Sequence, residues 1–228
     1  MSWQRDDDEP VPGGSDSGPS RTNMFRVLGV TLVLVLAVTL FFAFRGKESG
    51  TVGIGSVGIG EKVAPFAVPD ASSDLDGDAN IDPDKACEVD LPDAIRVCDF
   101  FDKPLVISFW FTKGVHGCDD QQDVFDKLED KYRGRVGLLS INVRGDRDEV
   151  RDMIKERGWK VPVGYDRDGA VSNIYHVGGC PSILFIKPGG ILKNAEIRRM
   201  TLSELDAQVR SLLKASDGSK VEPQNSEQ

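Results

Sequence analysis

The sequence lacks any concentration of positive charge. Its 28 Lys and Arg residues are outnumbered by 37 Asp and Glu residues, which gives a formal net charge of -9 at pH 7. Nowhere along the chain do basic residues cluster with interleaved aromatic residues. Because nucleic-acid binding depends on such clusters to neutralise phosphates, this absence excludes a nucleic-acid partner.

Long apolar runs are also absent, with one exception near the N-terminus. The run VLGVTLVLVLAVTLFFAF is uncharged, and as a helix its 18 residues would be about 27 Å long, enough to cross the hydrocarbon core of a bilayer. No small-x-small cleavage site follows it, as a signal peptide requires. We therefore expect an uncleaved transmembrane helix at 25–45. The flanking charges balance and leave its orientation open: Arg21 and Arg26 before it, Arg45 and Lys47 after it.

Apolar residues are scarce at both ends of the remaining chain. Residues 1–24 are acidic and rich in Pro, Gly and Ser, so we expect a disordered cytoplasmic tail there, and another disordered tail at 216–228. Residues 46–59 are Gly-rich and typical of a flexible linker. One domain is left at 60–215. A short tail inside the cell is the simpler export topology, which predicts a single-pass plasma-membrane protein with an extracytoplasmic C-terminal domain.

Within 60–215 the hydrophobic period changes repeatedly between that of a strand and that of a helix. PLVISFWF and RVGLLSINV are apolar runs typical of buried strands. DDQQDVFDKLEDKY and DRDEVRDMIKERG have helical spacing, and Gly158 ends the second as a cap. SILFIKPGGILKNAEI indicates two strands joined by a turn, and a final helix begins at a Thr201–Glu204 capping box. This order predicts an α/β fold with a central sheet and helices on both sides.

One of only four cysteines stands where the first core strand passes into a helix. The stretch FWFTKGVHGC ends at Cys118, directly before the predicted helix. The unpaired N–H groups and the positive dipole end of a helix favour a thiolate at such a position. Asp119 and Asp120 follow at once and oppose a second negative charge, so we expect only modest activation of this thiol.

Four stretches carry a family resemblance: IGEKVAPFAVPD, KPLVISFWFT, GYDRDGAVSNIYHV and GGCPSILFIKPGG. With them the chain resembles the thioredoxin-like redoxins, particularly the membrane-anchored, extracytoplasmic thiol-disulfide oxidoreductases, and more distantly the peroxiredoxins. The resemblance covers residues 60–213. It implies a thioredoxin-like fold, with a central mixed β-sheet flanked by helices, preceded here by the one transmembrane helix.

The chain departs from the redoxin pattern at the motif itself. Redoxins typically have a Cys-x-x-Cys pair after the Phe-Trp opening, but here the first position falls on Gly114 and Cys118 lies one residue past the second. The peroxiredoxin pattern would place its peroxidatic Cys on Cys118. Phe111 and Val115 occupy the Pro and Thr positions of that pattern, so the hydroxyl that orients a peroxide is missing. We expect thiol-disulfide exchange in preference to peroxidase activity.

The resemblance also supplies a candidate for the missing cysteine. In the related fold the proline corresponding to Pro181 is cis, and its loop lies against the active-site turn. This implies that Cys180 lies within bonding range of Cys118. We interpret Cys118 as the reactive thiol, Cys180 as its partner and Pro181 as the residue that shapes the substrate groove. A permanent Cys118–Cys180 staple and two inert buried thiols stay open as alternatives.

Cys87 and Cys98 form a second candidate pair. They flank EVDLPDAIRV, ahead of the first core strand. A bond between them would pin this insertion to the sheet and constrain the unfolded chain by about 2–3 kcal/mol. We expect a structural disulfide, with free thiols or a redox switch as the alternatives.

The sequence offers little to hold a metal or a cofactor. His116 with Cys118 and Cys180 gives three soft ligands, fewer than a zinc site needs, so we expect a loop histidine. SSDLDGDANIDPD has the alternating oxygen ligands of a calcium loop, but Pro83 stands where the closing Glu belongs. We expect a solvated acidic loop there, with weak calcium binding as the alternative, and neither a resident metal nor a cofactor.

These observations define a main hypothesis and an alternative. The main hypothesis is a membrane-anchored, extracytoplasmic thiol-disulfide oxidoreductase with an antioxidant role, which acts on protein thiols or disulfides or on an extracytoplasmic redox partner. The alternative is a redox-inactive thioredoxin-like module that binds polypeptide without reacting. A redox assay on Cys118 discriminates between them, because a fold does not by itself establish activity.

Overall fold

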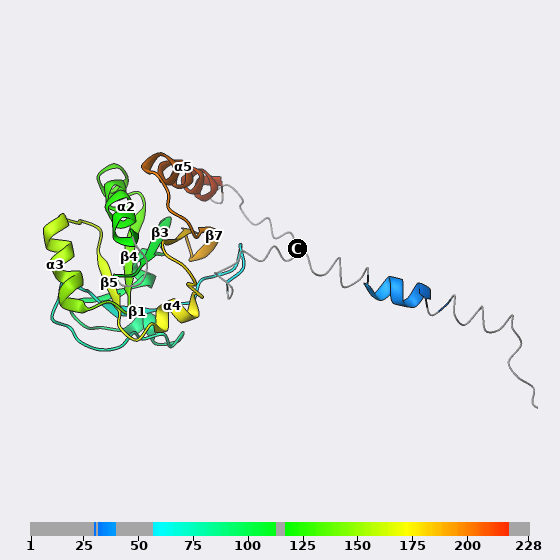
Figure 1. Ribbon diagram of the computed structural model, residues 1–228, viewed down its shortest axis with the longest axis horizontal. Helices are drawn as coiled ribbons and strands as arrows, with labels where there is room; N and C mark the ends of the chain where they lie inside the picture. Colours follow the sequence, from blue (N-terminus) through cyan, green and yellow to red (C-terminus); the bar gives the residue numbers. More distant parts are fainter. Residues whose placement is uncertain (1–29, 31, 40–56, 113–116, 219–228) are drawn as a thin grey trace, which may run out of the picture. The chain divides into compact units, whose positions relative to one another are not determined.

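The computed structural model describes Val30 and residues 32–39, 57–112 and 117–218 (Figure 1). The chain forms two compact units, which are described separately: Met1–Ser49 and Gly50–Gln228.

In the first unit, Val30 and residues 32–39 are helical and carry exposed apolar side chains. Across the ranges that the structure describes, no helix has both the length and the hydropathy needed to span a bilayer. The rest of the span expected at 25–45 lies outside the described residues, as do the tail at 1–24, most of the linker and the last ten residues of the chain. The transmembrane helix therefore stays a prediction.

The second unit is built on a mixed five-stranded sheet in the order β5-β4-β3-β6-β7. The central strand β3 pairs in parallel with β4 and antiparallel with β6, and β4 pairs in parallel with β5. The strands are β3 (Leu105–Trp110), β4 (Gly137–Val143), β5 (Val163–Asp166), β6 (Ser182–Lys187) and β7 (Ile191–Glu196). β3 and β4 are buried along their whole length, as expected for strands covered on both faces.

Four helices complete the second unit: α2 (Cys118–Tyr132), α3 (Arg147–Arg157), α4 (Ala170–Ile174) and α5 (Leu202–Gly218). The predicted caps are present. Gly158 ends α3 in the left-handed conformation, with φ 67°, as a glycine cap does. Thr201 and Glu204 exchange hydrogen bonds at the start of α5, where the Thr201 N–H donates to Glu204 at 2.8 Å and the Glu204 N–H donates to Thr201 Oγ1 at 3.3 Å.

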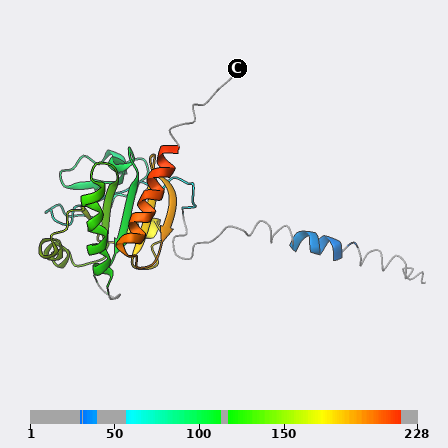
Figure 2. The same ribbon diagram turned by 90° about the horizontal axis from the view of Figure 1, so that it is seen from above.

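The two faces of the sheet carry separate cores, because side chains alternate along each strand. On one face, Ile107 and Phe109 of β3 pack with Phe66 and with Tyr175, which follows α4. On the other face, α2 and α5 lie side by side across the sheet (Figure 2), and their apolar stripes meet in one cluster. Those stripes comprise Phe125, Leu128, Tyr132, Leu205, Val209 and Leu212. The helices therefore cover both faces, as the sequence predicted.

The chain ahead of β3 packs on the face that carries α4. Two short strands, β1 (Ala67–Pro69) and β2 (Ala94–Arg96), pair antiparallel there. Two 3₁₀ turns, η1 (Ala86–Glu88) and η2 (Val97–Phe100), lie on either side of β2. The Tyr175 hydroxyl donates a 2.7 Å hydrogen bond to the carbonyl of Ala64, which fixes this segment to the main sheet.

Several short elements of the fold were not expected from the sequence, among them β1, β2, β5 and α4. β5 and α4 together occupy the stretch VGYDRDGAVSNI, which carried no strand or helix prediction. α5 also runs to Gly218, three residues beyond the boundary expected at 215. His176 is exposed and follows the end of α4 with φ 48°.

Candidate active site

The candidate site begins at the carboxyl end of the central strand. β3 ends at Trp110, and α2 begins at Cys118. Gly117, the residue before the helix, has φ 79°, a conformation that glycine adopts without strain. As a glycine, Gly117 supplies no side-chain cap to this end of the helix. The first-turn N–H groups and the positive dipole end therefore surround the Cys118 position.

The topology of the sheet brings a second loop to the same place. β6 runs antiparallel to β3, and Phe109 near the end of β3 is the register partner of Ser182, the first residue of β6. The residues that enter β6 must therefore lie beside the residues that leave β3. Those entering residues are Cys180 and the buried Pro181, which are joined by a cis peptide bond.

Cys118 and Cys180 form a disulfide at this junction. The sulfur atoms are 2.03 Å apart and the Cα atoms 5.9 Å apart, across a sequence separation of 62. The Cα distance lies within the usual range for a disulfide. The structure thus brings together the three residues that the sequence offered as catalytic candidates, and the cysteine missing from the turn is supplied by the loop before β6.

The two bonded cysteines differ in exposure. Cys118 is 1% exposed and belongs to an apolar cluster with Trp110 and Trp159, whose rings meet edge to face at 5.3 Å. Cys180 is half-buried and packs at the margin of the same cluster. Cys180 is therefore the more exposed residue of the pair.

Two arginines oppose the acidic residues that follow Cys118. Arg157 contacts Asp119 at 2.5 Å and Asp123 at 2.6 Å, and Arg199 contacts Asp120 at 3.0 Å. Burial disfavours the charged guanidinium of Arg157, but the hydrogen bond and charge of Asp123, together with the charges of the other two aspartates, raise its pKa. The repulsion of a thiolate expected from the sequence is therefore partly offset.

The connection between β7 and α5 lies against both cysteine loops. A Cβ added to Gly117 would stand 2.5 Å from Nη2 of Arg199, and one added to Gly179 would stand 2.7 Å from Cγ2 of Ile197. Each of these glycines directly precedes a cysteine of the pair. The missing side chains let this connection approach the disulfide closely. The sequence analysis missed Arg157 and Arg199, because nothing local links either of them to Cys118, which lies 39 or more residues away.

Polar side chains lie beneath the first turn of α2. Gln121 and Gln122 are both buried, one turn along the helix from Cys118. The amide oxygen of Gln121 accepts a 2.7 Å hydrogen bond from the N–H of Met200. Ser140 of β4, on the sheet below, accepts one of 2.8 Å from the indole of Trp110. Neither polar atom of Gln122 has a hydrogen-bond partner among the described residues.

Cys87 and Cys98 are joined in a second disulfide, apart from the first in sequence and packing. The sulfur atoms are 1.97 Å apart, the Cα atoms 5.6 Å apart and the sequence separation 11. The bond ties η1 to η2. Cys98 packs with the core on the α4 face of the sheet, whereas Cys118 belongs to a different cluster. The Cys87–Cys98 bond therefore connects parts of one insertion, whereas the Cys118–Cys180 bond connects the two candidate catalytic loops.

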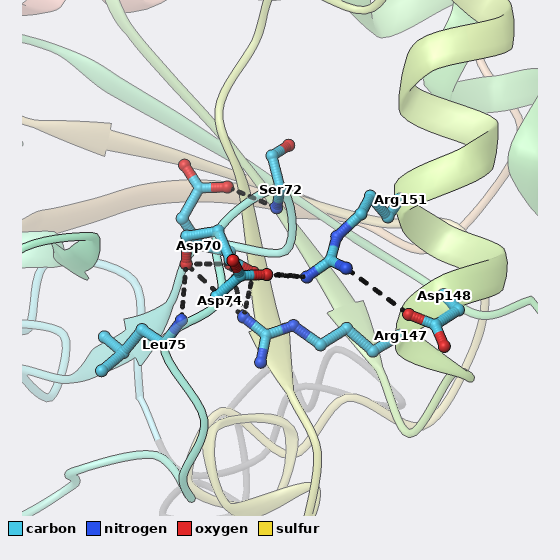
Figure 3. A network of polar contacts seen from close by, with 8 residues as sticks. Asp70, Ser72, Asp74, Leu75, Arg147, Asp148 and Arg151 are labelled. Carbon is cyan, nitrogen blue, oxygen red and sulfur yellow. Dashed lines mark hydrogen bonds and ion pairs between the residues drawn. The ribbon is translucent and has the colours of Figure 1, made fainter.

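The acidic loop considered for calcium is held by arginines. Figure 3 shows Arg147 and Arg151 reaching from α3 to this loop, where both donate to the carbonyl of Ser73, at 2.8 and 2.6 Å. Arg151 also pairs with Asp74 at 3.2 Å.

Two further acidic residues of this loop contact a third arginine. Arg167 contacts Asp76 at 3.1 Å and Asp78 at 2.7 Å. Over the described ranges, no group of three or more His, Cys, Asp or Glu side chains is arranged to hold a metal ion. The loop acids are thus occupied by cations of the chain itself. His116 lies outside the described residues.

Comparison with known proteins identifies a matching family and similar sequences. The sequence profile described as the AhpC/TSA family matches residues 59–195. Thiol-disulfide oxidoreductase ResA of Oceanobacillus iheyensis is 21% identical over 184 residues, which cover 80% of this chain and 85% of the relative. Thiol-disulfide oxidoreductase ResA of Geobacillus thermodenitrificans is 23% identical over 193 residues, which cover 84% and 96%.

Solved structures agree on the fold. A DsbF homologue from Corynebacterium diphtheriae superposes with a TM-score of 0.54 at 16% identity, covering 66% of this chain and 86% of that one. A secreted Mycobacterium tuberculosis disulfide oxidoreductase homologous to DsbE gives a TM-score of 0.51 at 16% identity, covering 64% and 94%. The second unit therefore has the thioredoxin-like α/β fold with a mixed central sheet, as predicted. At these identities the likeness concerns the fold alone.

Proposed function

The chain belongs to the AhpC/TSA family, and we propose that it is a thiol-disulfide oxidoreductase whose redox pair is Cys118 and Cys180. The observation that carries the proposal is the bond between these two cysteines, which joins the start of α2 to the loop before β6 and in which Cys180 is only half-buried. The names of the relatives from Oceanobacillus and Geobacillus describe the same activity.

The chemistry of the pair is a two-electron exchange with a protein partner. A thiolate attacks one sulfur of a disulfide, the opposite sulfur leaves as a thiolate, and the mixed disulfide is resolved by a second thiol. In the oxidised chain the bond between Cys118 and Cys180 accepts two electrons from a dithiol partner. In the reduced chain the two thiols return them to a partner disulfide. Pro181, buried beside Cys180, shapes the surface on which the partner lies.

The competing activities have less support. A peroxidase needs a hydroxyl to orient the peroxide, and the sequence has neither the Pro nor the Thr of that pattern. A redox-inactive binding module has no use for a disulfide that reaches the surface on one side, so this alternative is not favoured. An antioxidant role, where it exists, follows here from reducing oxidised protein partners.

We extend the proposal to the place of action. The apolar run at 25–45 anchors the chain in the plasma membrane, and the redox domain lies outside the cytoplasm, where disulfides persist. Its test is protease protection of a C-terminal tag in intact cells. Digestion of the tag before lysis supports the location, and protection until lysis refutes it.

The redox activity is tested on the full-length chain. Equilibration in glutathione buffers without denaturant, followed by maleimide trapping, reads the oxidation state of Cys118 and Cys180. We expect reversible reduction, catalysed reduction of insulin, and loss of turnover in Cys118→Ser and in Cys180→Ser. The control is the double variant Cys87→Ser/Cys98→Ser, which keeps turnover. A Cys118–Cys180 bond that yields only to denaturing reduction identifies a structural staple and refutes the proposal.

A further inference from the structure

We propose that Cys180, and not Cys118, is the sulfur through which the partner is bound covalently, while Cys118 serves as the leaving group and resolving thiol. The inference rests on the proposed function and fixes the order of its steps. It reverses the roles that the sequence pattern assigned, in which the cysteine at the helix start attacks. Two independent features of the structure, access and charge, agree on this order.

Access favours Cys180. The sulfur of a disulfide is attacked along the axis of the bond, so the attacking thiolate must reach the sulfur itself. Cys118 is 1% exposed and enclosed by an apolar cluster that includes Trp110, Val150 and Trp159. Cys180 is half-buried and stands at the margin of that cluster. A partner carried on a folded protein can approach only the second sulfur.

Charge favours Cys118 as the leaving group. The thiolate released fastest is the one that its surroundings stabilise best. Cys118 begins α2 directly after Gly117, which has no side chain to cap the helix, so the first-turn N–H groups and the positive dipole end lie at Cys118. The guanidinium of Arg199 lies against Gly117, directly before Cys118. Arg157 and Arg199 also offset the neighbouring aspartates. Cys180, in contrast, lies in the connection that enters β6.

The exchange consists of two thiol–disulfide steps. A partner thiolate attacks the sulfur of Cys180, a bond forms between these two sulfurs, and the bond to Cys118 breaks with its electron pair left on Cys118. A second partner thiolate then attacks the first partner sulfur and releases Cys180 as a thiolate. The partner has lost two electrons and the chain has gained two. In the reverse direction Cys180 attacks a partner disulfide, and Cys118 attacks Cys180 to release the partner.

The sequence allows direct identification of the attacked sulfur. Each of the four cysteines lies in a different tryptic peptide, because a Lys or Arg separates every pair. The oxidised full-length chain is mixed with reduced glutathione, quenched with acid after short times, alkylated with a maleimide and digested. We expect glutathione on the peptide that holds Cys180 and maleimide on the peptide that holds Cys118. Glutathione found mainly on Cys118 overturns the inference.

Single-cysteine variants give a second measurement. Cys118→Ser leaves Cys180 free, and Cys180→Ser leaves Cys118 free. With glutathione disulfide as the probe, we expect Cys118→Ser to form the mixed disulfide about tenfold faster than Cys180→Ser, since only the first exposes its thiol. Equal rates, or a faster Cys180→Ser, overturn the inference. Circular dichroism must show that both variants are folded, because a thiol in an unfolded chain would also react quickly.

The experiments distinguish failure of the redox function from failure of the order of attack. If the Cys118–Cys180 bond is not reduced under native conditions, the proposed function is refuted and the order of attack with it. If the bond is reduced and insulin is turned over, but glutathione maps to Cys118, the function stands and only the order is wrong.

Discussion

The guanidinium of Arg199 lies so close to Gly117 that a Cβ added to this glycine would stand 2.5 Å from Nη2. The same Nη2 contacts Asp120 at 3.0 Å. Arg199 thus places a positive charge beside the residue that precedes Cys118 and neutralises one of the two carboxylates that follow it. The relationship joins the β7–α5 connection to the first turn of α2, and it places a cation near the position of a thiolate at Cys118.

Arg199→Gln slows reduction of the Cys118–Cys180 bond. The variant removes the cation beside Gly117 and leaves Asp120 with only the longer contact to Arg157, at 3.8 Å. The arginine side chain is 60% exposed, so solvent screens its effect and we expect a slowing of about two- to fivefold. The measurement is the second-order rate of reduction by glutathione at low salt and at about 1 M salt, where the difference from wild type shrinks.

Arg198→Gln is the matched control for this variant. Arg198 adjoins Arg199 in sequence but pairs with Glu196 and Glu204, at 3.2 and 2.8 Å. Its loss changes the net charge by the same amount without touching the helix that carries Cys118. Equal slowing in the two variants would assign the effect to net charge and contradict a local role for Arg199.

Much of the fold was predictable because its signals are local. PLVISFWF gave the strand Leu105–Trp110 to within one residue at either end. The glycine at 158 and the capping box at 201–204 marked helix ends, since each supplies in sequence the partner that the terminal backbone groups need. The order of the predicted elements indicated a central sheet with helices on both sides, and the resemblance to redoxins implied that the sheet is mixed.

β5 and α4 were not predicted, because contacts with residues outside each element stabilise them. β5 has only four residues and is held by pairing with β4 on one side and by a bridge between Gly164 and Asp70. α4 has five residues and follows Asp166, whose buried carboxylate accepts from the N–H groups of Val171 and Ser172, at 3.0 and 2.8 Å. A cap supplied from inside the preceding strand does not have the spacing of an ordinary N-cap residue.

The candidate site was predictable only in part. The resemblance to redoxins pointed to the loop of Cys180 as the partner of Cys118, and these two loops do meet. The burial of Cys118 and the arginines that offset Asp119 and Asp120 were not visible, because they depend on segments distant in sequence. The carboxylates are neighbours of the thiol in the sequence, whereas the cations come close to them only in the folded chain.

Removal of the Cys87–Cys98 disulfide lowers stability without stopping exchange. The bond closes a short loop, with a sequence separation of 11, and a loop of this size constrains the unfolded chain by about 2–3 kcal/mol. We expect Cys87→Ser/Cys98→Ser to lose about that much free energy of unfolding in urea, and to keep the glutathione reduction rate of the Cys118–Cys180 bond. A rate loss that persists well below the unfolding midpoint would show that the two disulfides are coupled.

Substitution by leucine should change the free energy of unfolding in different ways at Gln121 and at Gln122, which are neighbours in the first turns of α2. Gln121→Leu removes the acceptor of the Met200 N–H and leaves a buried donor unpaired, which costs about 1–3 kcal/mol. Gln122→Leu removes two buried polar atoms that have no partner among the described residues, so the free energy of unfolding is unchanged or higher. Urea unfolding of the two variants measures the contrast, and equal destabilisation by both would contradict it.

Asp206 links α5 to the end of α2. Its carboxylate accepts hydrogen bonds from Lys131 and, at 2.6 Å, from the hydroxyl of Tyr132, and it also contacts Arg210. The hydrogen bond from Lys131, followed by that from Tyr132, lowers the pKa of Asp206 below its ordinary value. Burial and the hydrogen bond to Asp206 raise the pKa of Tyr132 to about 12. The charged form of Asp206 is thus favoured in the folded state.

This shift predicts how the acid limb of the stability curve depends on Asp206. Because the folded pKa lies below the unfolded value of about 3.9, the stability that Asp206 contributes is present above that value and is lost as the pH falls through the folded pKa. Asp206→Asn should therefore lower the urea midpoint near pH 7, and the midpoint of this variant should fall less steeply than that of wild type below about pH 4. Asp217→Asn, an exposed aspartate on the same helix, controls for net charge. A carboxylate whose pKa differs between the folded and unfolded states changes the slope of stability against pH between those two pKa values. If the stability of Asp206→Asn ran parallel to that of wild type throughout the acid range, the contacts of Asp206 with Lys131 and Tyr132 would not contribute to folding stability.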